Sequence, residues 1–339
     1  MLLVASLLLA GPGAGACQSA APAVETEGDG RIVVRRGEGR LAIGIPADEV
    51  LGMRILVGVG ALPDVGVGDL TLSAGTEPWP PDRTPPGAGS PGAGPRAGWI
   101  RTHVYGDYLA YELDHTIELR IEPRDAGPRF VYRDTQSGTE NRRRELEYGT
   151  RAGRLVSTFR ADGHCSEPGC ARARHLVGGG LFSGRRHCAG CRRAEHRVWR
   201  AATERELPAG AVDFLSAVYL ARAMVRAGTA EVSVPLVDQE RVWKLHLERG
   251  APRTVETRAG KFRCIELVTL VEAPAGEPGS DSEFTGLFGI GGALHIWLEA
   301  RTGVPIRIEG EVPVGLVELR ARLDLARYSG TPADFAPVE

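Results

Sequence analysis

VELRARLDL, residues 317–325, carries the pattern that decides the fold class. Its apolar and charged side chains alternate with a period of two: Val317, Leu319, Ala321, Leu323 and Leu325 alternate with Glu318, Arg320, Arg322 and Asp324. The alternation lapses at Ala326, which predicts that the strand ends near that residue. The same period recurs in HTIELRIEP (115–123) and in residues 154–160, 241–248, 261–271, 294–298 and 304–309. Strands of this kind form antiparallel sheets that cover a core with one face.

One segment follows a helical period instead. In VDFLSAVYLARAMVRAG, residues 212–228, Phe214 and Val218 are four residues apart and lie on one face of a helix. Asp213 is placed to cap the first turn and Gly228 to end the last one. The sequence therefore predicts a mainly β fold, with a curved antiparallel sheet or incomplete barrel around one helix at about 213–227. Arg301-Thr302-Gly303 predicts a hairpin turn between two of its strands.

The composition is that of a folded, globular chain. Its 339 residues are 42% hydrophobic and 25% charged, which excludes wholesale disorder. With 41 Lys and Arg against 43 Asp and Glu the net charge is −2, so we expect no nucleic-acid partner. The sequence contains no G-x-S-x-G, H-E-x-x-H, Walker A or kinase motif, and we assign no catalytic residue.

The first residues resemble an export signal. No charged residue precedes Glu25, and residues 2–10 form an apolar run that is too short to span a membrane. Ala14 and Ala16 fit a cleavage site directly before Cys17, although lipoprotein signals prefer Leu where Ala14 stands. We expect a signal peptide at 1–16, a lipid attached to Cys17 and a flexible tail at 17–30. The protein would then be exported to the periplasm or the outer membrane, with any membrane association through the lipid anchor. A buried N-terminal helix is the alternative.

The rest of the chain is expected to form a single β domain at 31–328, followed by a tail at 329–339. Residues 76–98 contain seven prolines and predict an extended Pro/Gly-rich excursion. The Gly/Pro/Ser-rich residues 272–292 predict a long loop between adjacent strands.

Several segments of the C-terminal half resemble a known family. They are DFLSAVYLAR (213–222), EVSVPLVDQERVWKLHLE (231–248), AGKFRCIELV (259–268) and LHIWLEARTGVPIRIEGEVPVGLVELRARL (294–323). In this order they resemble the bacterial domain of unknown function 3108 family, most clearly over residues 212–328. The resemblance implies an exported, mostly antiparallel β domain in which a curled sheet wraps one helix. The family has no established reaction, so the resemblance implies no catalytic residue.

Residues 163–197 form an insert rich in Cys and His. It contains Cys165-x4-Cys170 and Cys188-x2-Cys191, and four histidines lie around them as further candidate ligands: His164, His175, His187 and His196. Two short Cys pairs that meet would supply the four ligands of a structural zinc ion. An exported protein would instead oxidise them to two disulfides, and a redox Cys-x-x-Cys is a third alternative. In each case we expect the four cysteines to form one cluster, with Cys17 and Cys264 outside it.

The insert is also strongly basic. Between residues 171 and 200 eight arginines face one acid, Glu195. In the cell envelope such a segment would contact anionic lipid headgroups or lipopolysaccharide phosphates, and we name Arg185, Arg186, Arg192 and Arg193 as the contact residues. A solvated, Arg-rich loop is the alternative.

Two residues of the strand at 261–271 stand out. Glu266 shares the face of Phe262 and Cys264, so it is either buried and paired or placed at the rim of the sheet. Cys264 is explained as a small buried apolar residue.

These observations favour a non-enzymatic envelope protein whose curved sheet holds a lipid or another apolar ligand. The alternatives are a structural or assembly protein of the envelope, and a zinc-dependent enzyme that uses the insert. Zinc is the one cofactor that the sequence suggests.

Overall fold

The computed structural model describes the chain in fifteen segments. They are residues 24–26, 32–34, 44–58, 63–78, 96–108, 111–121, 128–138, 142–152, 154–162, 174–176, 183–185, 199–273, 291–314, 317–332 and 335–338.

Most of these residues lie in strands of one large sheet. The strands before the insert are β3 (Asp48–Gly58), β4 (Val65–Pro78), β5 (Arg96–Tyr108), β6 (Tyr111–Ile121), β7 (Pro128–Gly138), β8 (Arg142–Arg151) and β9 (Arg154–Ala161). The strands after it are β12 (Thr203–Glu206), β13 (Val212–Asp213), β14 (Glu231–Asp238), β15 (Arg241–Thr257), β16 (Gly260–Glu272), β17 (Gly291–Glu299), β18 (Pro305–Val314) and β19 (Val317–Gly330). Two small pairs lie outside the sheet: β1 (Val24–Thr26) with β2 (Ile32–Val34), and β10 (Arg174–Leu176) with β11 (Ser183–Arg185).

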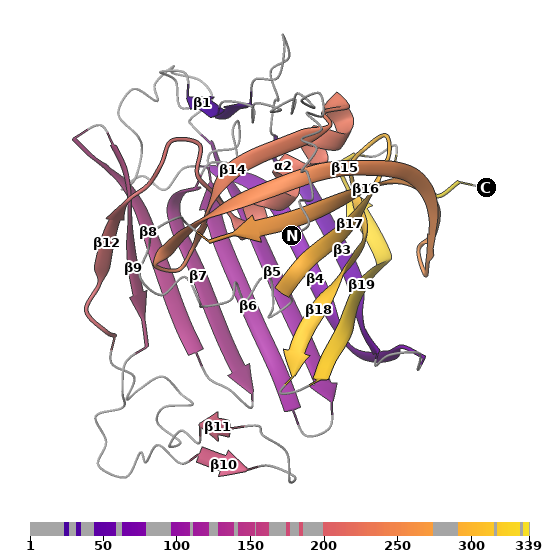
Figure 1. Ribbon diagram of the computed structural model, residues 1–339, viewed down its shortest axis with the longest axis horizontal. Coiled ribbons are helices and arrows are strands. Elements are labelled where there is room, and N and C mark those ends of the chain that lie inside the picture. Colours follow the sequence, from indigo (N-terminus) through magenta and orange to yellow (C-terminus); the bar gives the residue numbers. More distant parts are fainter. Residues whose placement is uncertain are drawn as a thin grey trace, which may run out of the picture.

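The fifteen strands of the large sheet follow the order β12-β9-β8-β7-β6-β5-β4-β3-β19-β18-β17-β16-β15-β14-β13. Every neighbouring pair is antiparallel except β13 and β14, which are parallel. The sheet curves around α2 (Phe214–Ala227) (Figure 1). It is open, since β12 and β13 are its two edges. The predicted mainly β fold with a curved antiparallel sheet around one helix is therefore confirmed for the described residues.

The two edges of the sheet lie close together in the sequence. Only residues 207–211 separate β12 from β13, and the Arg205 Nη1 atom donates to the Glu240 carbonyl oxygen across this gap at 2.9 Å. A small apolar cluster fills the space between the edges: Leu146, Tyr148, Phe159, Leu207, Ala211 and Val237. The sheet thus nearly encloses its core without closing its hydrogen-bond ladder.

The helix has the ends that the sequence predicts. The Asp213 carboxylate accepts from the backbone N–H groups of Leu215 at 2.8 Å and Ser216 at 3.0 Å, and from the Ser216 hydroxyl at 2.6 Å. Gly228 ends the helix in the left-handed conformation, with φ of 68°. Every residue from Leu215 to Val225 is buried, which is the pattern of a helix enclosed on all sides.

Two hairpin predictions are confirmed. Gly303 has φ of 74° in the turn between β17 and β18, where a left-handed conformation favours glycine. The strands on either side of residues 272–292, β16 and β17, pair with each other. The ends of the predicted excursion at 76–98 belong to paired strands, with Thr76 opposite Gly98, and its residues 79–95 lie outside the described residues.

One strand end was predicted wrongly. β19 does not end near Ala326 but continues to Gly330 beside β3. Its register shifts between Leu325 and Arg327, so Ala326 is the extra residue of a bulge. A bulge interrupts the alternation of faces without ending the strand.

Candidate functional site

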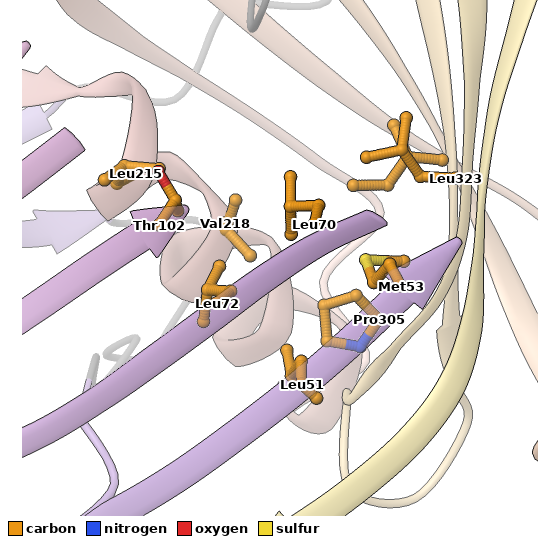
Figure 2. Close-up of a pocket in the computed structure, with 10 residues that line it drawn as sticks. Leu51, Met53, Leu70, Leu72, Thr102, Leu215, Val218, Pro305 and Leu323 are labelled. Carbon is orange, nitrogen blue, oxygen red and sulfur yellow. The ribbon is translucent and has the colours of Figure 1, made fainter. Parts of the chain in front are cut away.

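An apolar cavity of about 20 Å³ lies between α2 and the strands β3–β5 (Figure 2). It is lined by Leu51, Met53, Leu70, Leu72, Thr102, Leu215, Val218, Pro305, Ile308 and Leu323. A cavity of this size has room for about one water molecule, whereas drug-sized ligands occupy about 300–1,000 Å³. A lipid chain would therefore need the side chains around the cavity to move.

Thr102 is the one polar residue in the wall of this cavity. The strand register places it in one inward-facing row with Leu51, Leu72 and Ile117. Its exposed fraction is 1%, and its hydroxyl oxygen has no hydrogen-bond partner. A buried hydroxyl without a hydrogen-bond partner is unusual, because most buried polar atoms are paired.

A buried ion pair ties α2 to β3 beside the cavity. The Arg222 Nη1 atom lies 2.6 Å from the Glu49 Oε2 atom, and the side chains are 8% and 0% exposed. The Tyr219 hydroxyl donates to the same oxygen at 3.2 Å. Burial and the nearby Glu49 carboxylate raise the pKa of Tyr219 well above its usual value, so this phenol remains a neutral donor. Gly303 packs against the backbone of Arg222, where a Cβ atom would lie 2.9 Å from the carbonyl oxygen.

A second polar cluster forms the neck from which the insert leaves the sheet. The neck comprises Arg143, Arg160, Asp162 and Trp199. Asp162 and Trp199 form an antiparallel bridge that joins the two ends of the insert. The guanidinium carbons of Arg143 and Arg160 lie 4.5 and 4.6 Å from the centre of the Trp199 ring. Arg143 also donates to the Asp162 carboxylate at 2.9 Å, so both ends of the insert are held.

Glu145 lies beneath the neck. It is 5% exposed, and its carboxylate accepts from the Nε atoms of Arg133 at 2.9 Å and Arg160 at 2.6 Å. Burial acts to raise the pKa of Glu145, but the hydrogen bonds from the two arginines outweigh it and hold the pKa below the usual value. The carboxylate therefore remains charged and holds Arg160 in place beside Trp199.

The outer face of β16 and β17 carries a Glu–His pair. The Glu266 Oε1 atom lies 2.8 Å from the His295 Nδ1 atom, and His295 stacks on Trp297 with 5.9 Å between the ring centres. Glu266 is thus paired, but its side chain is 22% exposed, and it does not share the buried face of Phe262 and Cys264 as predicted. The buried face passes from Cys264 to Ile265 and Leu267, which leaves Glu266 on the outer face. His295 was not predicted as its partner because the alternation along a strand does not reveal the register of its neighbour.

Cys264 is buried, as predicted. Desolvation, followed by the charge of Glu299, raises the pKa of its thiol to about 12. The thiol is therefore protonated at neutral pH and unreactive as a nucleophile.

The predicted site residues of the insert and the N-terminus lie outside the described side chains. This holds for Cys17, for the cluster Cys165, Cys170, Cys188 and Cys191, for His164, His175, His187 and His196, and for Arg185, Arg186, Arg192 and Arg193. The backbones of His175 and Arg185 are described, on β10 and β11 respectively. Among the side chains that the structure does describe, no three His, Cys, Asp or Glu residues gather in a way that could hold a metal ion. Within the described residues no helix is both long and apolar enough to cross a membrane.

The sequence segments that resemble a known family lie on β14–β19 and α2. Residues 193–323 match the family described as Protein of unknown function (DUF3108). The predicted resemblance is therefore confirmed, and the DUF3108 match includes the helix and the strands from β12 to β18.

Two solved structures are similar to this chain. One is a protein from Bacteroides fragilis that is thought to be exported and has a YmcC-like fold; it shows 9% identity and a TM-score of 0.30, over 85% of this chain and 99% of its own. The other is thought to be a lipoprotein from Parabacteroides distasonis; it shows 8% identity and a TM-score of 0.29, over 86% of this chain and 100% of its own. No curated protein matches the chain.

Proposed function

We propose that this chain is a non-enzymatic, exported protein of the cell envelope that presents its basic insert to an anionic surface. The observation that carries the proposal is the neck. Both ends of the insert meet at the Asp162–Trp199 bridge, and two guanidinium groups enclose the indole of Trp199. The large sheet thereby joins the two ends of the insert.

The charges around the neck favour the same role. Glu145 pairs with Arg133 and Arg160, and Asp162 pairs with Arg143, so arginines of the sheet are neutralised locally. The insert has eight arginines and one acid between residues 171 and 200. Phosphate groups of lipids or lipopolysaccharide have the chemistry that matches this excess of arginine.

The buried ionisable groups support a role without catalysis. Asp213 caps α2, Glu49 binds Arg222, and Glu145 binds two arginines, so each of these carboxylates stabilises the fold. Burial raises the pKa of Asp213, whereas the hydrogen bonds from its two arginines lower the pKa of Glu145. Structural ion pairs account for such shifts without a catalytic role.

Vesicle binding tests the proposal. Chain with Cys17→Ser, which excludes a lipid anchor, is mixed with phosphatidylglycerol-containing or pure phosphatidylcholine vesicles and sedimented. We expect binding to the anionic vesicles only. The variant Arg192→Gln/Arg193→Gln should weaken it at least tenfold, at about 1 kcal/mol per arginine near the surface, and Arg185→Gln/Arg186→Gln should act alike.

The matched control is Arg258→Gln/Arg263→Gln, which removes two exposed arginines from the hairpin of β15 and β16. If this control weakens binding as much as the variants of the insert do, binding reflects total charge and the proposal is wrong.

Attachment to the membrane is proposed to occur through a lipid on Cys17. In the host, wild-type chain should then fractionate with membranes and incorporate labelled palmitate. Cys17→Ser should lose the label and shift to the soluble periplasmic fraction. A wild-type chain that is exported but carries no label would contradict the anchor alone.

The four cysteines of the insert are proposed to form one cluster that holds it together. A segment with few apolar residues buries too little surface to offset its chain entropy, and a cross-link or a metal ion supplies the missing order. Thiol titration separates the chemistries: thiols that appear only after reductant indicate disulfides, and thiols that appear after chelator indicate zinc. Zinc held by all four cysteines would be structural, since it leaves no open coordination position for catalysis. Thiols that are free under all conditions would contradict the cluster.

The second role that we propose is the binding of an apolar ligand inside the curved sheet. The apolar cavity between α2 and β3–β5 is the observation that favours it. Mass spectrometry of protein extracted gently from its host tests this role, since a lipid should then co-purify in a fixed ratio. Protein that carries no lipid under these conditions would contradict it.

A further inference from the structure

We propose that the tip of the β15–β16 hairpin carries a docking site for an extended peptide, and that its partner is a second copy of this chain. Within one copy the site holds residues 335–338, which we call the strap. The ligand class is a peptide with an aromatic residue that is followed, two positions later, by proline. The inference goes beyond the roles proposed for the insert and for the apolar cavity, and it depends on neither.

The first argument is the edge of β16 at the tip of the hairpin. In the register of the described strands β17 pairs with β16 from Cys264 to Thr269, so the start of β16 extends past β17. The strap takes this edge. The Val338 N–H group donates to the Lys261 carbonyl oxygen at 2.6 Å, and the two residues form an antiparallel bridge. Addition of an extended segment to the edge of a sheet is a common mode of peptide recognition.

The second argument is an aromatic anchor. The Phe335 ring stacks on Phe262, with 5.1 Å between the ring centres and 8° between the planes. The ring centre of Tyr328 lies 4.4 Å from that of Phe335. Phe262 is only 1% exposed, and Phe335 packs against it from the partly buried side. The sheet thus supplies two fixed rings and the strap supplies a third, which is the arrangement of an anchor residue in a peptide complex.

The third argument is the close approach of Pro337 to Gly260. Gly260 has φ of 128°, and a Cβ atom at this position would lie 2.6 Å from the Pro337 Cβ atom. Any side chain at residue 260 would therefore push the strap away. The glycine leaves room for the proline, and the ring and the backbone contacts fix the residues on either side of it. The three contacts together specify the aromatic residue, the proline and the extended backbone of the ligand.

The fourth argument is that the strap can leave without the rest of the fold. The chain before it is fastened separately: the Thr331 N–H group donates to the Asp48 carbonyl oxygen at 2.9 Å, and the Thr331 hydroxyl donates to the Asp48 carboxylate at 2.8 Å. Residues 336–338 are exposed, and Val338 is 47% exposed. Release of the strap therefore leaves β19 paired with β3.

A second copy is the partner because every copy of the chain carries a strap that fits. When the strap leaves, the rings of Phe262 and Tyr328 face water, which favours a new apolar occupant. Two copies that exchange straps form the same contacts that each makes alone, and the exchange closes as a two-fold symmetric dimer. A tethered strap competes at an effective concentration of about 1 mM, so we expect the dimer at high protein concentration.

A peptide that copies the strap tests the site. Fluorescein-labelled TPADFAPVE, residues 331–339, is titrated with the full-length variant Phe335→Ala, whose own strap lacks its anchor. We expect saturable binding by fluorescence anisotropy. Wild-type chain should bind the peptide at least about tenfold more weakly, because its own strap competes.

Two matched peptides separate the contacts. A peptide with Phe335→Ala should bind the Phe335→Ala chain at least about tenfold more weakly than the strap peptide, since it lacks the anchor. A peptide with an N-methyl group on Val338 cannot donate to Lys261 and should bind about fivefold more weakly, the effect of one neutral hydrogen bond.

Sedimentation velocity tests the second copy and uses the wild-type chain, so it does not depend on a variant that folds. We expect a dimer whose share rises with protein concentration. An excess of the unlabelled strap peptide should dissociate it, whereas the peptide with Phe335→Ala should not. The Phe335→Ala chain should remain a monomer under the same conditions.

The remaining outcomes overturn the inference. If the three peptides bind alike, or if wild type binds the strap peptide as tightly as the Phe335→Ala chain does, the peptide is not held at the strap site. A wild-type chain that stays monomeric at every concentration, or a dimer that the strap peptide does not dissociate, excludes the second copy as the partner. The roles proposed for the insert and for the apolar cavity are unaffected by each of these results.

Discussion

The interior around α2 and the neck of the insert both use Arg–Glu pairs, but in opposite environments. Inside, the side chains of Arg222 and Glu49 are 8% and 0% exposed. Beside the neck, the side chain of Glu145 is 7% exposed, whereas the side chains of its partners Arg133 and Arg160 are 57% and 38% exposed. Both side chains of the interior pair are thus buried, whereas in the pairs of Glu145 only the carboxylate is buried.

This difference determines what happens when a partner is lost. A guanidinium group at the neck can turn into water, so the loss of its carboxylate leaves a solvated charge. Arg222 has no such exit because it lies in the buried part of α2. Its charge would remain in the core without a partner, which is strongly unfavourable. The same residue types therefore contribute very differently in the two regions.

The largest effect is expected from breaking the interior pair. Glu49→Ala should lower the free energy of unfolding by about 3–5 kcal/mol, because it leaves the Arg222 charge buried and unpaired. Urea denaturation followed by circular dichroism measures it. The double variant Glu49→Leu/Arg222→Met removes both charges and should recover most of the loss. A loss below about 1 kcal/mol in the single variant would mean that water reaches Arg222.

A smaller, local effect is expected at the neck. Trp199→Ala removes two cation–π contacts of about 0.5–1 kcal/mol each and should destabilise the neck by about 1–2 kcal/mol. Hydrogen exchange should increase at the Arg200 amide, which donates to the Ala161 carbonyl oxygen at 2.9 Å, and remain unchanged in α2. Trp199→Phe keeps an aromatic ring and should change exchange less. Equal exchange in all three proteins would show that the indole does not hold the neck.

Acid should weaken the neck through Glu145. The folded pKa of Glu145 lies below its usual value, so this group stabilises the fold above the unfolded pKa of about 4.3. The contribution is lost as the pH falls through the lower folded pKa. Wild type and Glu145→Gln should differ by about 1 kcal/mol at pH 7 and converge once the pH has fallen below the folded pKa of Glu145. A difference that persists in acid would contradict the role of the charge.

The smallest effect is expected for solvent-exposed ion pairs at the edge of the sheet. Arg151 and Glu204 lie 2.6 Å apart, but their side chains are 72% and 37% exposed. Arg151→Ala should change the free energy of unfolding by less than about 1 kcal/mol, and 1 M salt should abolish the difference. A larger effect that resists salt would mean that distance matters more than burial, and the comparison of the two regions would lose its basis.

Much of the fold could be predicted from local patterns. The alternation of faces identified strands, and Asp213 and Gly228 marked the ends of α2, because caps act on residues within one turn. Glycine in the turn at 301–303 marked a hairpin for the same local reason. The prediction failed at Ala326 because a bulge and a strand end interrupt alternation in the same way.

The candidate sites were less accessible to sequence reasoning. Thr102 occupies an apolar position of an alternating strand and looks like any strand threonine. Only the rows formed with β3, β4 and β6 show that its hydroxyl is isolated. In the same way, Glu266 was recognised as an exception on its face, but its partner His295 depends on the register between β16 and β17.

By itself, the sequence determined that much of the chain forms alternating strands, where the helix begins and ends, and which family the C-terminal half resembles. These properties depend on neighbours within a few positions. Only the tertiary structure decided that β12 and β13 are the edges, that Trp199 lies between Arg143 and Arg160, and that Glu49 meets Arg222. An alternating strand can pair with any other alternating strand in several registers, so its pattern specifies a face but no partner. The partners are chosen when the whole sheet curls around α2, because only one arrangement buries all the apolar faces together.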